Sequence, residues 1–387
     1  MTGAGSGLIV GRYVMGPYGT IERGSVSFED GFIVEVGGSS AVSAPSNGQL
    51  VEADELIVAP GLIDIQINGG FGHDFTNEPG SIWEVGARLP TFGVTSFIPT
   101  VVTSTAETRV TMLDVLAKGA PANYRGAMPL GVHFEGPFIS PQASGAHDPS
   151  LLRLPGDAEP DVARWSRAAG VLMATIAPEL DGALDLVRTL VARGVVVSAG
   201  HSAATRDQAI AGFEAGVTYA THLFNAMPPL GHREPGLAGA ALVDQRVTSG
   251  LIADGIHVHP DVINIALNTT WWERLSLVTD ATAALGMPLG QFLLGNRLVV
   301  LDGTSVRLAE DGRLAGSALA ADEALRRFHS FTGCAPEAVI HTMTTVPSKL
   351  LALNDRGVLR PGRRADLTLF DVDLSVVATY IAGEKWG

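Results

Sequence analysis

Five polar residues in this sequence have side chains of the types needed for metal-assisted acid–base chemistry. They are Gln66, Glu135, His201, His222 and Asp280, and each lies at the end of a short, mostly apolar run. Two histidines and one carboxylate form the ligand set of a catalytic zinc site, which leaves a fourth position for water. We therefore take Glu135, His201 and His222 as candidate metal ligands. Asp280 is the candidate general base, which takes a proton from water and returns it to a leaving group.

Each of these residues also has a structural interpretation. A histidine among apolar residues, such as His222, is often only a hydrogen-bonded core residue, and Glu135 alone could belong to a buried ion pair. Asp280 could cap the turn that follows it. Three buried polar groups at the ends of three different strands would each need a separate buried partner, so their convergence favours a metal site.

The elements that must position these residues are eight short apolar runs ending in polar residues. Segments with helical spacing, such as 181–193 and 204–215, separate most of them, and this alternation is typical of a parallel sheet buried on both faces. We predict an α/β fold in which the runs close into a (β/α)₈ TIM-like barrel with the site at the carboxyl ends of its strands. The alternative is an open doubly wound sheet. The runs are 62–68, 94–102, 131–138, 172–179, 195–202, 219–225, 248–254 and 275–281.

The two ends of the chain differ from the barrel region in their sequence pattern. Residues 1–57 and 357–387 read as short strands separated by turn signals. We expect both ends to build one small β-sandwich domain beside a barrel at 58–356. A hairpin-like stretch, 291–314, follows the eighth run, and the last barrel helix is expected to start near Ala318.

Composition excludes several classes of protein. The net charge of −14, without clustered Lys and Arg, argues against nucleic-acid binding, and no apolar run is long enough to span a bilayer. The chain does not open with a signal-peptide pattern, and its single cysteine, Cys334, has no partner for an internal disulfide. We expect a cytoplasmic protein in which any anionic substrate is captured by local groups.

The first run, "LIDIQINGG", carries two neutral amides at alternate positions, Gln66 and Asn68. Residues two apart on a strand share one face, and an unsatisfied buried amide costs about 1–3 kcal/mol. The site at the mouth of the barrel should therefore supply polar partners for both amides.

The motifs resemble, in their order, those of the N-acetylglucosamine-6-phosphate deacetylases of the amidohydrolase superfamily, over most of the chain. The matching segments are "PGLIDIQINGG", "HFEGPFIS", "GAHDP", "GHS", "THLFNAM", "REPGLAG", "DGIHVHP" and "LVTDAT". The resemblance implies hydrolysis of the N-acetyl group of N-acetylglucosamine 6-phosphate to glucosamine 6-phosphate and acetate, in amino-sugar metabolism. It also implies that Glu135, His201 and His222 bind the metal and that Asp280 is the general base and acid.

The resemblance assigns further residues to the substrate. His147 of "GAHDP" would help to polarise the acetamide carbonyl as a second catalytic residue. Asn225, the backbone N–H of Ala226, Arg233 and His257 would bind the substrate, chiefly its phosphate. In similar enzymes this arginine reaches across from a second subunit, so the resemblance implies a homodimer.

The sequence also departs from the common superfamily pattern. Many amidohydrolases carry a His-x-His pair on the first strand for a second metal, whereas this chain has Gln66 and Asn68. Amide oxygens are poorer zinc ligands than imidazole, so we expect one tightly bound metal, with Gln66 ordering water or a weak second ion. Zn²⁺ is the expected metal, although the ligand set also suits Fe²⁺, Co²⁺ and Mn²⁺. The loop 140–149 has no Lys before its Gly-Ala-His, where relatives often have one.

Two other functions remain open at this stage. One is an amidohydrolase acting on a different N-acyl or cyclic amide, in which case Asn225 and Arg233 would have no phosphate to bind. The other is a catalytically inactive barrel with a structural role, which the retained Glu, His, His and Asp set disfavours.

Overall fold

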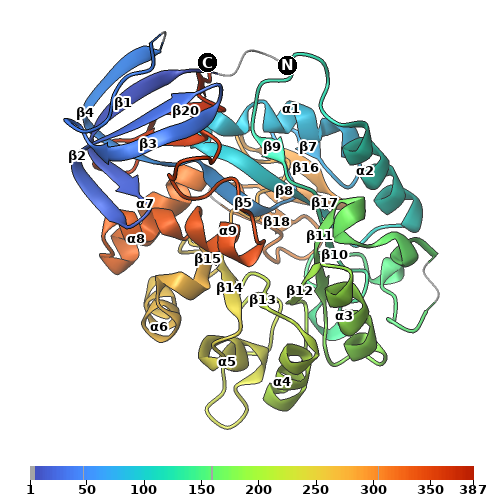
Figure 1. Cartoon of the computed structure of the whole chain (residues 1–387). Helices are drawn as coiled ribbons and strands as arrows, with labels where there is room; N and C mark the ends of the chain where they lie inside the picture. The colour runs from blue at the N-terminus through green and yellow to red at the C-terminus, as the bar shows by residue number, and fades with distance from the viewer. Residues whose placement is uncertain (1–4, 47, 158–159, 304) are drawn as a thin grey trace.

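Eight parallel strands form the centre of the molecule, a computed structural model that describes residues 5–46, 48–157, 160–303 and 305–387 (Figure 1). Each strand coincides with one of the eight predicted runs, and only β11 begins one residue before its run, at Val171. A parallel bridge between Ile67 and Ala281 and a hydrogen bond from Asp280 N–H to the Gln66 carbonyl (2.9 Å) join the last strand to the first. The predicted barrel is confirmed, and the open doubly wound sheet is wrong. In order around the barrel the strands are β5 (Leu62–Ile67), β8 (Val94–Val102), β10 (Val132–Glu135), β11 (Val171–Ile176), β12 (Val196–Ala199), β13 (Tyr219–Ala220), β14 (Thr248–Leu251) and β15 (Leu275–Leu277).

Helices surround this sheet and connect its strands (Figure 1). Both predicted helical segments are present, and Thr205 caps the second by the reciprocal hydrogen bonds with Gln208 that define a capping box. The last large helix begins at Ala321 and not near Ala318, because the chain is still extended there and Ser317 pairs with Ala281. The α-helices are α1 (Ile82–Gly86), α2 (Ala106–Lys118), α3 (Ala183–Ala192), α4 (Arg206–Ala215), α5 (Gly236–Val243), α6 (Pro260–Thr270), α7 (Ala321–Thr332), α8 (Pro336–His341) and α9 (Thr345–Leu350).

Strands from both ends of the chain join in a second, seven-stranded sheet at the side of the barrel (Figure 1). Its apolar residues, among them Ile9, Val26 and Leu367, pack in a core of their own. Strand β4 crosses residue 57 and ends directly before β5, so we propose that the β domain and the barrel join here without a linker. The strands are, in sheet order, β21 (Glu384–Lys385), β20 (Val376–Ile381), β19 (Leu367–Phe370), β4 (Gln49–Pro60), β1 (Gly7–Gly16), β2 (Gly19–Glu29) and β3 (Phe32–Gly38).

The stretch predicted as hairpin-like, 291–314, forms a small antiparallel sheet on the rim of the barrel. It consists of β16 (Gly290–Leu294), β17 (Arg297–Leu301) and β18 (Val306–Leu308). The Asn296 side chain donates to Asp148 of the loop that carries His147, and Asn77 donates to the Gly295 carbonyl (2.6 Å). The small sheet is thereby tied to the loops around the barrel mouth.

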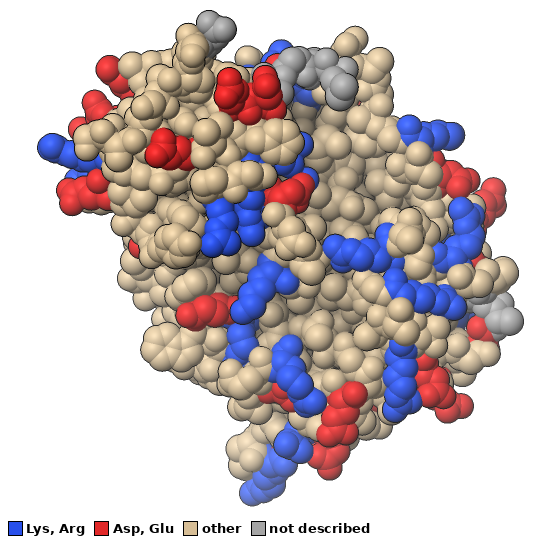
Figure 2. Space-filling model, viewed as in Figure 1, with Lys and Arg blue, Asp and Glu red and all other residues tan. Residues whose placement is uncertain are grey.

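Short elements complete the chain. They are strands β6 (Gly69–Gly70), β7 (His73–Asp74) and β9 (Met128–Pro129), and 3₁₀-helices η1 (Pro79–Ser81), η2 (Leu89–Phe92), η3 (Pro141–Ala143), η4 (Pro149–Leu151), η5 (Pro160–Arg164), η6 (Arg167–Ala169) and η7 (Trp272–Arg274). In the ranges that the structure describes, no helix is both long and apolar enough to cross a bilayer. On the face drawn in Figure 2, Lys and Arg side chains are interspersed with Asp and Glu.

A buried ion pair supports the strand that carries Glu135. Arg109 on α2 donates from Nε and Nη2 to the Asp161 carboxylate at 2.8 Å, and both side chains are only 2% exposed. Asp161 also accepts a hydrogen bond from Trp165 Nε1 (3.0 Å), whose rings pack 4.8 Å from the Phe134 ring. Phe134 directly precedes Glu135, so the Arg109–Asp161 ion pair, through Trp165, supports the aromatic packing next to Glu135.

Replacing Arg109 with Met should destabilise the protein by about 3–5 kcal/mol, because it leaves the Asp161 charge buried and unpaired. Urea unfolding followed by circular dichroism measures this change. The control is Arg188→Met, since Arg188 pairs with Asp185 at the surface, where the side chains are 59% and 88% exposed. Its cost should stay below about 1 kcal/mol, and equal midpoints for the two variants would contradict the prediction.

Candidate active site

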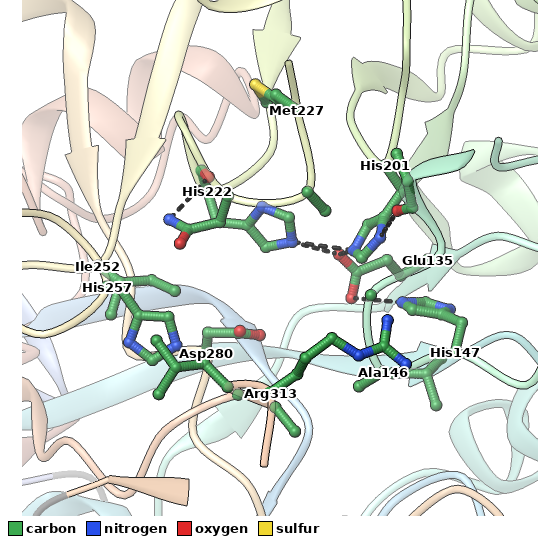
Figure 3. Close-up of a pocket in the computed structure, with 18 of the residues that line it drawn as sticks. Glu135, Ala146, His147, His201, His222, Met227, Ile252, His257, Asp280 and Arg313 are labelled. Atoms are coloured by element: carbon green, nitrogen blue, oxygen red, sulfur yellow. Dashed lines mark hydrogen bonds and ion pairs between the residues drawn. The ribbon is translucent and has the colours of Figure 1, made fainter. Parts of the chain in front are cut away.

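The carboxyl ends of the barrel strands surround a cavity of about 490 Å³. Figure 3 shows that its lining residues come from different strands and point toward a common centre. Sequence-predicted residues that line it are Glu135, His147, His201, His222, Asn225, Ala226, His257 and Asp280. Gln66 lies just beneath and hydrogen-bonds to two of them. Arg233 does not line this cavity.

Three candidate metal ligands meet at one point of the cavity. Glu135 Oε1 lies 3.3 Å from His201 Nε2 and 3.2 Å from His222 Nε2, and the two Nε2 atoms are 3.0 Å apart. Ligand atoms placed tetrahedrally at zinc-bonding distances lie roughly 3.4 Å from one another. The spacing therefore fits a metal ion bound at the centre of the three atoms.

The hydrogen bonding of His201 supports this assignment. Its Nδ1 lies 2.9 Å from the Ala143 carbonyl, which can only accept, so Nδ1 carries a proton; in the neutral ring, the form that binds metals, Nε2 then presents a lone pair. That lone pair faces the Glu135 carboxylate oxygen, which is also an acceptor. A shared proton would satisfy one such contact at a time, whereas a divalent cation satisfies all three ligands together.

His147 is also close enough to be considered a ligand. Suitable atoms of Glu135, His147 and His201 lie within 4.8 Å of one another. However, His147 Nδ1 lies 3.2 Å from the backbone N–H of Thr103, which can only donate, and 2.8 Å from the Thr103 hydroxyl, which can donate to the same nitrogen. Burial, reinforced by the nearby His201, lowers the pKa of His147 well below its usual value, so the ring is neutral and its proton lies on Nε2. His147 is therefore a hydrogen-bond donor to the cavity and not a metal ligand.

The two amides of the first strand anchor the candidate general base. Asn68 Nδ2 donates to Asp280 Oδ1 at 2.8 Å, and Gln66 Nε2 donates to the same oxygen at 3.3 Å and to Glu135 Oε1 at 3.1 Å. Burial and the neighbouring Glu135 charge raise the pKa of Asp280. Among the described residues, Asp280 Oδ2 receives no hydrogen bond, so this oxygen is available to exchange a proton.

Strained backbone places several of these side chains. His201, His222, Ala226 and Asp280 have φ angles of 46°, 26°, 50° and 49°, in the left-handed region that non-glycine residues rarely adopt. Such conformations cost about 1–3 kcal/mol each and concentrate at functional sites. These residues come after the ends of barrel strands, and the left-handed backbone conformation directs their side chains inward, over the mouth of the barrel.

The far side of the cavity contains the residues predicted to bind phosphate. The backbone N–H of Ala226 has no hydrogen-bond partner among described residues, whereas Asn225 Nδ2 donates to its own turn, to the carbonyls of His222 (3.2 Å) and Leu223 (3.3 Å). His257 Nδ1 lies 2.6 Å from Asp254 Oδ2, which accepts its proton and leaves Nε2 as the ring's second polar atom. Burial alone would raise the pKa of Asp254, but His257 outweighs it and lowers this pKa.

Sequence reasoning missed three contributors to the site. Asp254 carries a signal, because a carboxylate three residues before a histidine can turn back onto it. Thr103 directly follows the predicted run 94–102 but has no distinctive sequence pattern. Arg313 lines the cavity from the turn after strand β18, outside the run of barrel strands that carries the other site residues.

Comparison with known proteins gives consistent matches. A sequence model of the amidohydrolase family matches residues 57–385. The N-acetylglucosamine-6-phosphate deacetylase of Rattus norvegicus is 42% identical over 342 residues, which cover 85% of this chain and 83% of the relative. The N-acetylgalactosamine-6-phosphate deacetylase of Escherichia coli is 37% identical over 349 residues, which cover 90% of this chain and 92% of that relative.

A solved structure extends this similarity to three dimensions. It is a variant of the N-acetyl-D-glucosamine-6-phosphate deacetylase from Mycobacterium smegmatis in complex with N-acetyl-D-glucosamine 6-phosphate. Its TM-score is 0.89 at 34% identity, and the match covers 98% of this chain and 99% of that chain.

Proposed function

Because the chain belongs to the amidohydrolase family, and within it to the N-acetylglucosamine-6-phosphate deacetylases, we propose that it hydrolyses N-acetylglucosamine 6-phosphate to glucosamine 6-phosphate and acetate. The observation that carries this proposal is the convergence of Glu135, His201 and His222 beside Asp280 in one cavity. The reaction places the protein in amino-sugar metabolism.

We propose one tightly bound divalent ion, with Zn²⁺ as the expected metal, held by Glu135, His201 and His222. When bound, this ion would supply Lewis-acid polarisation of the acetamide carbonyl and would acidify a water molecule. His147 Nε2–H donates to the acetamide oxygen as negative charge develops on it. The Gln66 and Asn68 oxygens have no partner within the described part of the chain and would order water or a weak second ion.

Asp280 moves the proton. With Oδ1 held by the two amides, its free Oδ2 accepts the proton from the attacking water and then donates it to the departing amine nitrogen. Its raised pKa favours the return step, since a carboxyl that is too acidic would hold its proton weakly.

We propose that the phosphate is bound by the Ala226 N–H, Asn225 and His257, and by Arg233 of a second subunit in a homodimer. Arg233 is exposed on the loop that leaves the cavity at Pro228 and is not among the residues that line its own site. Leu230 on this loop and Val243 at the end of α5 are 47% and 61% exposed, which suits a contact surface. We retain the cytoplasm as the proposed location, because Cys334 is a free thiol.

The deacetylase proposal predicts metal-dependent amine release from N-acetylglucosamine 6-phosphate. Dialysis against a chelator should abolish turnover, Zn²⁺ should restore it, and elemental analysis should find one tightly held metal per chain. Glu135→Gln should lose most of the metal, whereas His259→Asn, at an exposed helix cap, should keep it. Absence of amine release with every divalent metal tested would reject the proposal. Parallel assays with N-acetylgalactosamine 6-phosphate measure how well the enzyme accepts the epimeric sugar as a substrate.

Asp280→Asn should lower kcat by roughly 10²–10⁴-fold while metal content and KM change little, because only the proton transfer is lost. In the unmodified enzyme, kcat/KM should fall as the pH decreases through the raised Asp280 pKa, since the base must be ionised. Near-normal turnover in the variant would remove Asp280 from the mechanism.

Mixed dimers test the origin of Arg233. Arg233→Ala alone should raise KM more than it lowers kcat. Mixing it with inactive Asp280→Asn chains should restore low-KM activity, because the intact Asp280 site then receives Arg233 from the other subunit. No restoration after verified subunit exchange would show that the arginine does not act across an interface.

A further inference from the structure

We propose that Arg313, in the turn that follows strand β18 of the rim sheet, is a substrate-binding residue that contacts the phosphate group of the sugar phosphate. This inference rests on the proposed function and extends it to a residue outside the barrel strands. Arg313 is the only Lys or Arg among the described residues that line the cavity. In Figure 3 its side chain reaches into the cavity toward the side on which Ala146 and His147 lie.

The position of Arg313 is set by the active-site backbone. Leu308 N–H donates to the Arg313 carbonyl (2.8 Å), and Leu314 bridges to Arg307, so Arg313 ends a tight turn after β18. Four residues later, Ser317 N–H donates to the Asp280 carbonyl (2.8 Å). The segment that carries Arg313 is thus hydrogen-bonded to the segment that carries the general base.

The guanidinium is oriented but keeps donors available. Its Nε donates to Asp311 Oδ2 at 2.7 Å, and Nη2 lies 2.7 Å from the same oxygen. Nη1 makes no hydrogen bond in the ranges described. The side chain is 53% exposed, so it can turn toward a ligand at little desolvation cost. An oriented arginine with free N–H groups is suited to bind phosphate oxygens.

The charges around the cavity create the need for such a group. The whole chain carries a net charge of −14, so a phosphate dianion approaches the cavity against the overall repulsion of the protein. The loop 140–149, to which the rim sheet is tied by the hydrogen bond from Asn296 to Asp148, contains no Lys or Arg. Arg313 supplies positive charge from the same chain, independently of any second subunit.

Arg313→Met tests this assignment, because methionine keeps the apolar stem and removes the charge and donors. We expect KM for N-acetylglucosamine 6-phosphate to rise roughly 10–100-fold, the effect of losing a charge-assisted hydrogen bond, with a smaller change in kcat. Arg313→Lys should fall between the two. The matched control is Arg297→Met on β17, where Arg297 pairs with Glu310 (2.7 Å) and does not line the cavity.

Calorimetric titration separates phosphate binding from other roles. Affinity for glucosamine 6-phosphate and for inorganic phosphate should fall in Arg313→Met, whereas affinity for unphosphorylated N-acetylglucosamine should not change. An unchanged KM, or equal losses for phosphorylated and unphosphorylated ligands, would overturn the assignment. If the unmodified protein deacetylates the phosphosugar and only the variant result fails, the proposed function stands and this inference alone is rejected.

Discussion

The site depends on one physical constraint: atoms that carry lone pairs are held facing one another in a buried cavity. With a neutral His201 ring, Glu135 Oε1 and His201 Nε2 are acceptors 3.3 Å apart, and His222 Nε2 lies 3.2 Å from the first and 3.0 Å from the second. In a water-poor interior this arrangement is unfavourable unless a cation occupies the centre. Metal binding is therefore coupled to the stability of the folded site, and the surrounding polar contacts serve to orient its ligands.

Proton positions around this centre are decided by groups with a single hydrogen-bonding capacity. A carbonyl at Ala143 requires the proton of His201 on Nδ1, and an N–H at Thr103 requires the proton of His147 on Nε2. Two neighbouring histidines thus take opposite tautomers, one suited to bind a metal and one to donate to an oxyanion. Fixed backbone groups achieve this without additional charges in the cavity.

The amides of the first strand illustrate how a superfamily position changes its role. Where many amidohydrolases carry two metal-binding histidines, Gln66 and Asn68 donate to the carboxylates of Glu135 and Asp280. Their N–H groups partly compensate the two negative charges, which a second metal would otherwise do. The segment that follows the rim sheet is tied to the same region, because the Ser317 N–H donates to the Asp280 carbonyl.

The sequence by itself determined the barrel and most of its polar mouth, because apolar runs that end in Glu135, His201, His222 and Asp280 reveal both the strand period and the edge at which strands end. Tertiary structure alone decided the rest. The Ala143 carbonyl and the Thr103 N–H lie 58 and 44 residues from the histidines they orient, and Arg313 reaches the cavity from a turn outside the barrel pattern. Backbone groups are identical at every position of a sequence, so only folding determines which side chain each one meets.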